Sequence, residues 1–387
     1  MFRIFKKDSN EKKYNIDLVF GLFFILILLG KVVRYTIMKN VLVDSGIGHF
    51  FINPILYGNY KFTFFDADSM SGEAGGNAIL IFRFINIFKL DTYYAWEIYI
   101  SFIWNIILIG ILVGVNKEIN LKQLLFIILS IIVLNIFDFT LAKEPIQMLY
   151  FIAIYYVLTM SNKGEKFKYI STIVILMISA ITFRVYYFLI IMFMIYTQLL
   201  LHIFILKKEK VRIKDILFIL LLIVIFYYIF LNIVKVAMPS QFSELIRVRT
   251  RTSEAASDMR NIFKSSNLIV FSVDYLIMIL RMLFPVELLR LGVKYIPYVF
   301  YQIVITLFII NAIKKVRNND VIKNIVLYLF IGFLFASAAF EPDFGSWIRH
   351  EAVLFPVLLI VANIKKRSMK GKSKKDEWFN FYNCTSL

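Results

Sequence analysis

Apolar runs close to the length of a membrane span recur along the whole chain and constrain its fold more than any other feature. A helix needs about 20 predominantly apolar residues to cross a bilayer. Apolar and aromatic residues make up 60% of the 387-residue sequence, more than a soluble domain of this length can bury. The alternating ten-residue strands of an outer-membrane barrel are absent from the sequence. We therefore predict an all-α, polytopic integral membrane protein that forms a single membrane domain over residues 1–387.

The lengths of these runs predict about ten transmembrane helices. The run at 169–206 is too long for one span and is divided by Arg184, so we predict two spans joined by a tight turn at that residue. The predicted spans are 17–38, 95–115, 123–141, 145–160, two within 169–206, 216–236, 296–313, 321–340 and 352–363.

Two long segments, 39–94 and 237–295, are too polar and too broken to cross a bilayer as a whole. Each contains a short apolar stretch, 77–88 in the first and 268–284 in the second. Arg83 interrupts the first stretch. We interpret both stretches as re-entrant or interfacial helices, with a full span as the alternative for 268–284.

Lys and Arg fall in short clusters after alternate predicted spans, and the net charge is +18. Cytoplasmic loops of membrane proteins carry an excess of Lys and Arg. We therefore place both termini, including the basic tail 365–387, in the cytoplasm, and the two long segments outside the cell membrane. The same bias accounts for the net charge without a nucleic-acid partner. The first apolar run follows a long polar leader, and the run lacks a small-residue cleavage site, so we expect an uncleaved span.

A polar stretch at 340–351, with the sequence FEPDFGSWIRHE, separates the last two predicted spans. Ionisable groups at the end of a span are costly and are functional by default. Acids, a histidine and an arginine supply a proton acceptor and a clamp for an anionic leaving group. The alternative is a polar turn with Trp347 as an interfacial anchor. We favour the functional interpretation and select as candidate catalytic residues Glu341, Asp343, Arg349 and His350.

Further charged residues gather on the same predicted outer side. Arginine grips phosphate in a bidentate manner, so these residues point to a membrane-embedded phosphate such as an undecaprenyl-diphosphate glycan. The apolar surfaces of the spans would hold the polyprenyl tail. The candidate substrate-binding residues are Asp66, Asp68, Lys143, Glu144, Arg184, Arg247, Arg249, Arg251 and Arg260.

Several of these residues also fit a structural role. Arg247, Arg249 and Arg251 alternate, so in an extended segment they share one face, which suits lipid headgroups or solvent as well as a substrate. The Lys143-Glu144 pair fits an ion pair at a helix end, and Arg184 fits a simple turn marker. Asp66-Ala-Asp68 fits either a Mg²⁺ or Mn²⁺ site or a solvated loop. We favour the loop and expect no metal or other cofactor.

Taken together, these features resemble the Wzy-type polysaccharide polymerases of capsule and O-antigen clusters, which are polytopic membrane glycosyltransferases of the GT-C-like kind. The likeness rests on the many spans, the large outer segment late in the chain, and the short motifs FGSWIRH at 344–350, Lys143-Glu144, Arg184 and 281–285. It implies an enzyme of the bacterial cytoplasmic membrane. Such an enzyme transfers a glycan from its undecaprenyl-diphosphate carrier to a sugar hydroxyl of another lipid-linked repeat unit.

The resemblance also implies partners and roles. The partners are the lipid-linked donor and acceptor glycans, the bilayer, and the chain-length regulator and flippase of the same pathway. We assign the base to His350, Glu341 or Asp343. We assign the binding of the leaving diphosphate to five arginines, Arg184, Arg247, Arg249, Arg251 and Arg349.

Two other classes of protein stay open. A transporter or lipid-linked-oligosaccharide flippase would carry polar residues along its spans near the middle of the bilayer, with short loops and often inverted repeats. We find no internal repeat, and the polar groups concentrate on one predicted face, which favours an enzyme. A ligase or other GT-C glycosyltransferase with a polyprenyl-phosphate donor would share the same donor site.

Overall fold

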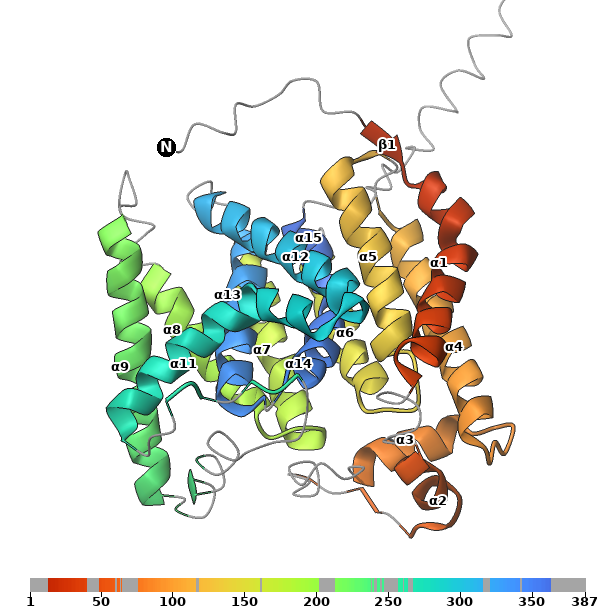
Figure 1. Cartoon of the computed structure of the whole chain (residues 1–387), viewed down its shortest axis with the longest axis horizontal. Helices are drawn as coiled ribbons and strands as arrows, with labels where there is room; N and C mark the ends of the chain where they lie inside the picture. Colours follow the sequence, from red (N-terminus) through yellow and green to blue (C-terminus); the bar gives the residue numbers. More distant parts are fainter. Residues whose placement is uncertain are drawn as a thin grey trace, which may run out of the picture.

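The computed structural model is mostly helical (Figure 1), which confirms the predicted all-α fold. The residues that it describes are 13–39, 49–59, 61, 62, 64, 76–115, 118–160, 162–201, 213–237, 239, 242, 243, 246, 257–259, 261–263, 267–315, 321–341 and 343–362.

Most of the helices follow the predicted apolar runs, whereas the helices at 49–57 and 344–352 lie outside them. Those before the predicted turn at Arg184 are α1 (Asp17–Thr36), α2 (His49–Tyr57), α3 (Gly76–Ile85), α4 (Tyr93–Val113), α5 (Leu121–Phe137), α6 (Glu144–Thr159) and α7 (Glu165–Thr182). Those after it are α8 (Tyr187–Leu201), α9 (Ile213–Ala237), α11 (Leu268–Leu283), α12 (Ile296–Lys315), α13 (Val321–Phe340), α14 (Phe344–Ala352) and α15 (Phe355–Val361). Two 3₁₀ helices, η4 (Val286–Leu291) and η5 (Val293–Tyr295), lead into α12.

Local sequence signals explain several helix boundaries. Asn120 and Gln123 form a reciprocal capping box at the start of α5. Thr92 caps α4 by accepting a hydrogen bond from the amide of Ala95. Pro356 lies in the first turn of α15, where its missing N–H costs nothing. A proline there is incompatible with a helix that continues from α14, and α14 and α15 meet at an angle of 71°.

Three helical stretches of the described residues are long and apolar enough to cross a membrane, namely 17–36, 93–113 and 293–313. The bent pair α14–α15 makes a fourth if it is one broken span. Two apolar helices are shorter, α5 with 17 residues and α8 with 15 residues, and the stretches 221–237 of α9 and 324–340 of α13 are also apolar. The helices therefore suit a membrane protein. Fewer than the ten predicted spans meet this length criterion, because polar turns such as 138–143 and 183–186 end helices inside the bundle.

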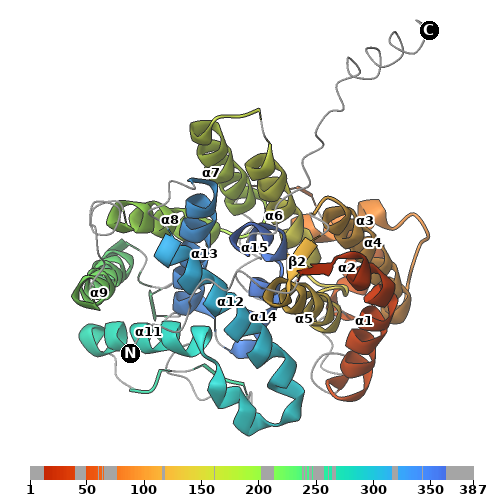
Figure 2. The same cartoon turned by 90° about the horizontal axis from the view of Figure 1, so that it is seen from above.

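Helices α14 and α15 occupy the middle of the bundle, with α5, α6, α12 and α13 around them (Figure 2). Trp347 in α14 is fully buried, so the interfacial-anchor alternative for this tryptophan is wrong. Its indole packs against Phe333 of α13, with ring centroids 5.8 Å apart. The polar stretch at 340–351 is thus largely a central helix and not a surface turn.

The first and last described segments lie at the same end of the bundle. Two short strands, β1 (Lys13–Asn15) and β2 (Glu118–Asn120), form an antiparallel pair just before α1 and α5. Gln123, in the first turn of α5, donates a hydrogen bond from Nε2 to the carbonyl of Ala362 at 2.7 Å. The chain therefore enters and leaves the described bundle on one side.

A buried ion cluster joins α1, α4 and the end of α5. Glu97 Oε1 lies 2.5 Å from Arg34 Nε and 3.3 Å from Lys31 Nζ. Arg34 also donates to the carbonyl of Ile136 at 2.6 Å and to Thr140 Oγ1 at 3.1 Å. The two basic residues of the first span therefore point into the bundle, where they hold the segment between α5 and α6.

Helices α2 and α3 pack together at the end of the molecule opposite β1 (Figure 1). Arg83 of α3 donates to the carbonyls of Ile55 at 3.0 Å and Pro54 at 2.9 Å, and also to that of Gly58. The arginine that breaks the apolar run thus donates hydrogen bonds to carbonyl groups at the end of α2.

Candidate functional site

Four segments far apart in the sequence bring charged side chains together inside the bundle. Glu144 begins α6, Arg184 lies in the turn between α7 and α8, Glu341 follows the last residue of α13, and His350 belongs to α14. All four side chains are buried. We call these four residues the His350 cluster.

The imidazole of His350 lies at the centre of the cluster. Its Nδ1 is 2.5 Å from Glu341 Oε1. Its Nε2 is 2.5 Å from Arg184 Nη1 and 3.4 Å from Glu144 Oε1. Arg184 Nη2 lies 3.9 Å from the same glutamate oxygen. Both ring nitrogens thus face charged partners.

These contacts define the tautomer of His350. A guanidinium group has donors only, so Nε2 must accept the hydrogen bond from Arg184. The ring proton is then on Nδ1 and is donated to Glu341. This is the arrangement in which a carboxylate orients a neutral imidazole and leaves Nε2 as the basic atom. If Nε2 takes up a proton, Glu144 is close enough to stabilise the resulting imidazolium.

The electrostatics of the cluster favour an ionised Glu341. Burial raises the pKa of its carboxyl group. Favourable interactions with His350 and the positive charges of Arg184 and Arg349 outweigh burial, and the pKa lies below its ordinary value. The carboxylate is therefore available to accept the Nδ1 proton of His350 at neutral pH.

Aromatic side chains hold the guanidinium of Arg184 in place. Arg184 Nη1 donates to Tyr186 Oη at 3.2 Å. The guanidinium carbon lies 5.4 Å from the ring centroid of Phe183 and 5.7 Å from that of Tyr186, which suits cation–π attraction. Arg184 is therefore more than a turn marker. Tyr186 was not among the candidates, because one tyrosine among 22 carries no distinguishing sequence signal.

Asp343 and Arg349 lie on α14 but make local contacts. Asp343 is the N-cap of α14, and its carboxylate accepts a hydrogen bond from the amide of Ser346 at 2.9 Å. Arg349 donates to the carbonyl of Gly345 at 3.3 Å and to Ser346 Oγ at 3.4 Å. Its positive charge nevertheless acts on Glu341, Glu144 and Asp138. The carboxylate of Asp343 thus has a structural role as a helix cap. Arg349, in contrast, borders the His350 cluster.

A second set of contacts fixes the start of α14. The amide of Phe344 donates to the carbonyl of Ser257 at 2.9 Å. The Phe344 ring lies 5.8 Å from the guanidinium carbon of Arg281. That guanidinium binds Glu287 through Nε and Nη2 at 2.6–3.0 Å. The segment 281–287 therefore supports α14 from the side.

The other sequence candidates are only partly placed. Lys143 is buried and directly precedes α6. Six candidates, Asp66, Asp68, Arg247, Arg249, Arg251 and Arg260, lie outside the described residues. Within the described ranges, no group of three His, Cys, Asp or Glu side chains is arranged to hold a metal ion.

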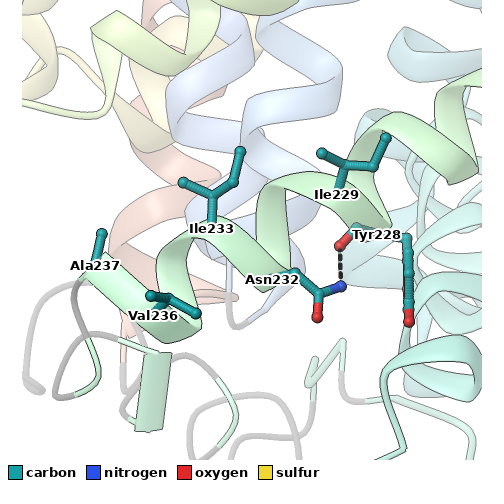
Figure 3. A pocket seen from close by; sticks show the side chains of 6 residues that line it. All are labelled: Tyr228, Ile229, Asn232, Ile233, Val236 and Ala237. Carbon is teal, nitrogen blue, oxygen red and sulfur yellow. Dashed lines mark hydrogen bonds between the residues drawn. The ribbon is translucent and has the colours of Figure 1, made fainter.

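A separate surface pocket lies on the second half of α9 (Figure 3). Its polar group Asn232 donates from Nδ2 to the carbonyl of Tyr228 at 2.8 Å. None of the lining side chains carries a charge, so we assign no phosphate group to it. The residues that line it are Tyr228, Ile229, Asn232, Ile233, Val236 and Ala237.

Comparison of the chain with protein-family models, curated proteins and solved structures found no match. Fold and site together define a helical protein with apolar helices suited to a membrane. A carboxylate-oriented histidine and a buried arginine lie inside it.

Proposed function

We propose that this protein is a glycosyltransferase of the polysaccharide-polymerase type. It joins undecaprenyl-diphosphate-linked oligosaccharide repeat units at the outer face of the bacterial cytoplasmic membrane. The observation that carries the proposal is the His350 cluster, where a carboxylate-oriented imidazole lies within 2.5 Å of a buried guanidinium.

The transfer step needs a base, and His350 suits this role. The acceptor hydroxyl oxygen forms a bond to the anomeric carbon of the donor glycan, and the bond from that carbon to the diphosphate breaks. The hydroxyl proton passes to Nε2 of His350, and the electron pair leaves with the lipid diphosphate. Glu341 and Glu144 stabilise the imidazolium that forms.

The leaving diphosphate needs positive charge, which Arg184 supplies. In the described arrangement Arg184 donates to Nε2 of His350. When Arg184 turns toward the diphosphate, it releases the basic lone pair of the histidine. The arrival of the donor and the availability of the base are therefore coupled. Arg349 at the border of the cluster adds a second positive charge.

The proposed topology keeps about ten spans and cytoplasmic termini. The strands β1 and β2 and the last turn of α15 lie at the same end of the bundle. This supports a chain that enters and leaves the membrane on the same side. On this topology the polar turns 138–143 and 183–186 belong to the outer half of the protein, where the lipid-linked repeat units meet the enzyme.

A lipid-linked-oligosaccharide flippase is the second candidate. The bent pair α14–α15 favours it, because discontinuous helices near polar groups recur in transporters. A ligase would use the same donor but a different acceptor. The two kinds of transferase and the flippase leave different lipid-linked products.

The test is complementation of a deletion strain with the wild type or His350→Ala, followed by size analysis of the surface glycan and the lipid-linked pool. Loss of a general base lowers the rate about 10²–10⁴-fold, so single repeat units on the lipid should accumulate. Arg290→Ala, which alters an exposed arginine, is the control and should make normal polymer. Normal polymer from His350→Ala contradicts the assigned base, and repeat units trapped on the cytoplasmic side indicate a flippase.

A further inference from the structure

Asp138 is a fully buried acid at the end of α5 that the proposed transfer step does not use. It is the C-cap residue of α5, and its amide donates to the carbonyl of Leu134 at 2.9 Å. Its exposed fraction is 0%. The segment 138–143 ends at Lys143 and leads directly into Glu144 at the start of α6.

Neither carboxyl oxygen of Asp138 has a hydrogen-bond partner among the described residues. Each of the other buried acids in the described ranges has a hydrogen-bond donor or a positively charged group as its partner. Glu97 pairs with Arg34, Asp274 accepts from the amides of Ile262 and Phe263, and Glu351 accepts from Gln302. Glu341 accepts the Nδ1 proton of His350, and Glu144 lies 3.9 Å from Nη2 of Arg184. Among the six buried acids of the described residues, Asp138 is therefore the one whose carboxyl group has no hydrogen-bond partner.

An unpartnered buried carboxyl group is costly to the folded state. An apolar side chain such as leucine could fill the same position without that cost. A group of this kind that persists in a packed interior is therefore a candidate for a ligand contact.

The position of Asp138 ties it to the His350 cluster. The charged side chains that act on its carboxyl group are Glu144, Arg349 and Arg34. Glu144 belongs to the cluster, and Arg349 borders it. Asp138 thus lies near the same site, at the end of α5, which packs against α14.

The backbone around Asp138 is held by the buried ion cluster of α1 and α4. Arg34 donates to the carbonyl of Ile136 and to Thr140 Oγ1, and Lys31 donates to the carbonyl of Phe139 at 2.8 Å. These bonds lie on both sides of Asp138 in the sequence. They hold its backbone in place, which is what a positioned binding group needs.

We propose that Asp138 binds a hydroxyl group of the lipid-linked saccharide at this site and contributes to substrate affinity. A carboxyl group accepts hydrogen bonds from sugar hydroxyls through both oxygens. The inference rests on the proposed function, because it takes the saccharide as the ligand.

The experiment uses the full-length protein in lipid nanodiscs and measures polymer formation from the lipid-linked repeat unit extracted from the deletion strain. Asp138→Leu removes both hydrogen-bonding oxygens and should raise KM about 10–100-fold, as loss of a buried hydrogen bond does. Asp138→Asn keeps one oxygen and should raise KM by a smaller factor. In both variants kcat should change less than KM.

A structural role would give a different pattern. If Asp138→Asn, which preserves shape, has the KM of the wild type, the inference is overturned even if Asp138→Leu fails to fold. A fall in kcat with unchanged KM also overturns it, because that result marks an interaction made only in the transition state and not a contribution to substrate affinity. If the deletion strain accumulates no lipid-linked repeat unit, the proposed function itself fails, which is a separate result.

Asp274→Asn is the matched control. Asp274 is a buried acid of α11 whose oxygens accept backbone amides. Its replacement should lower stability and leave KM unchanged. A KM shift equal to that of Asp138→Asn would contradict a specific role for Asp138.

Discussion

At the scale of single residues, the site depends on which atoms of His350 are donors and acceptors. Glu341 takes the Nδ1 proton, and Arg184 donates to Nε2. The His350 cluster is stable because each of its four buried side chains has a partner of opposite sign or a hydrogen bond. Removing one partner leaves the others uncompensated, so single substitutions in this cluster should affect both stability and activity.

The lowered pKa of Glu341 makes stability depend on pH. Below the ordinary value of 4.5, the unfolded chain binds this proton before the folded protein does. The stabilisation is therefore fully present above that pH and is lost as the pH falls through the folded value. Glu341→Gln should be less stable than the wild type at neutral pH, and the two thermal unfolding curves should converge in acid.

Thermal unfolding in detergent, followed from pH 7 into acid, measures this difference. Glu165→Gln removes an exposed carboxylate and serves as the control, with a pH dependence like that of the wild type. A constant gap between Glu341→Gln and the wild type at every pH would contradict the assigned role.

At the scale of elements, close helix contacts determine how the segments of the site meet. Gly332 of α13 packs on α8, where an added Cβ would lie 2.8 Å from the carbonyl oxygen of Ile190 and from the amide nitrogen of Met194. Gly30 allows a similar approach of α1 to α5, with an added Cβ 2.8 Å from Asn135 Cβ. Small residues let helices approach closely when packing drives their association. The α8–α13 contact brings the Arg184 turn toward Glu341.

Gly332→Ala should lower the free energy of unfolding by about 1–3 kcal/mol, because backbone atoms of α8 must move to admit the methyl group. The same change should reduce polymer formation by shifting Arg184 relative to Glu341. Gly110→Ala is the control, since an added Cβ there meets nothing within 4 Å. Denaturation in mixed detergent micelles measures both variants, and equal stability of the two would show that the α8–α13 contact is not tight.

At the scale of the whole molecule, three groups of buried charges lie toward one end of the bundle. The His350 cluster, Asp138 and the Arg34–Glu97 cluster all involve the polar ends of apolar helices. Burial of these groups away from lipid avoids the cost of a charge in hydrocarbon. The proposed outer location of this end follows from the distribution of Lys and Arg along the chain.

The single cysteine provides a direct test of that topology. Cys384 belongs to the basic tail that we place in the cytoplasm. A membrane-impermeant maleimide should label it only after the cells are permeabilised. Ser71→Cys in a Cys384→Ser background lies in the first outer segment and should be labelled in intact spheroplasts. Labelling of Cys384 in intact spheroplasts would overturn the orientation.

The sequence alone predicted where most of the helices lie, because apolar length and polar breaks are local properties of the chain. The turn at Arg184 and the short helix near Arg83 follow from such breaks. It also singled out Glu144, Arg184, Glu341 and His350, since ionisable groups among apolar runs are conspicuous. The sequence did not identify Asp138 as a site residue, because an acid at the end of an apolar run also indicates an ordinary helix boundary.

Only the tertiary structure decided which of these residues meet. Helix packing brings residues 144, 184, 341 and 350 together, whereas Asp343 caps its own helix. Helix packing also places Trp347 in the interior and brings Arg34 next to Glu97. The physical reason is that helix formation depends on near neighbours in the chain. The partner of a buried charge depends on which helix faces it across the bundle, and no local pattern encodes that.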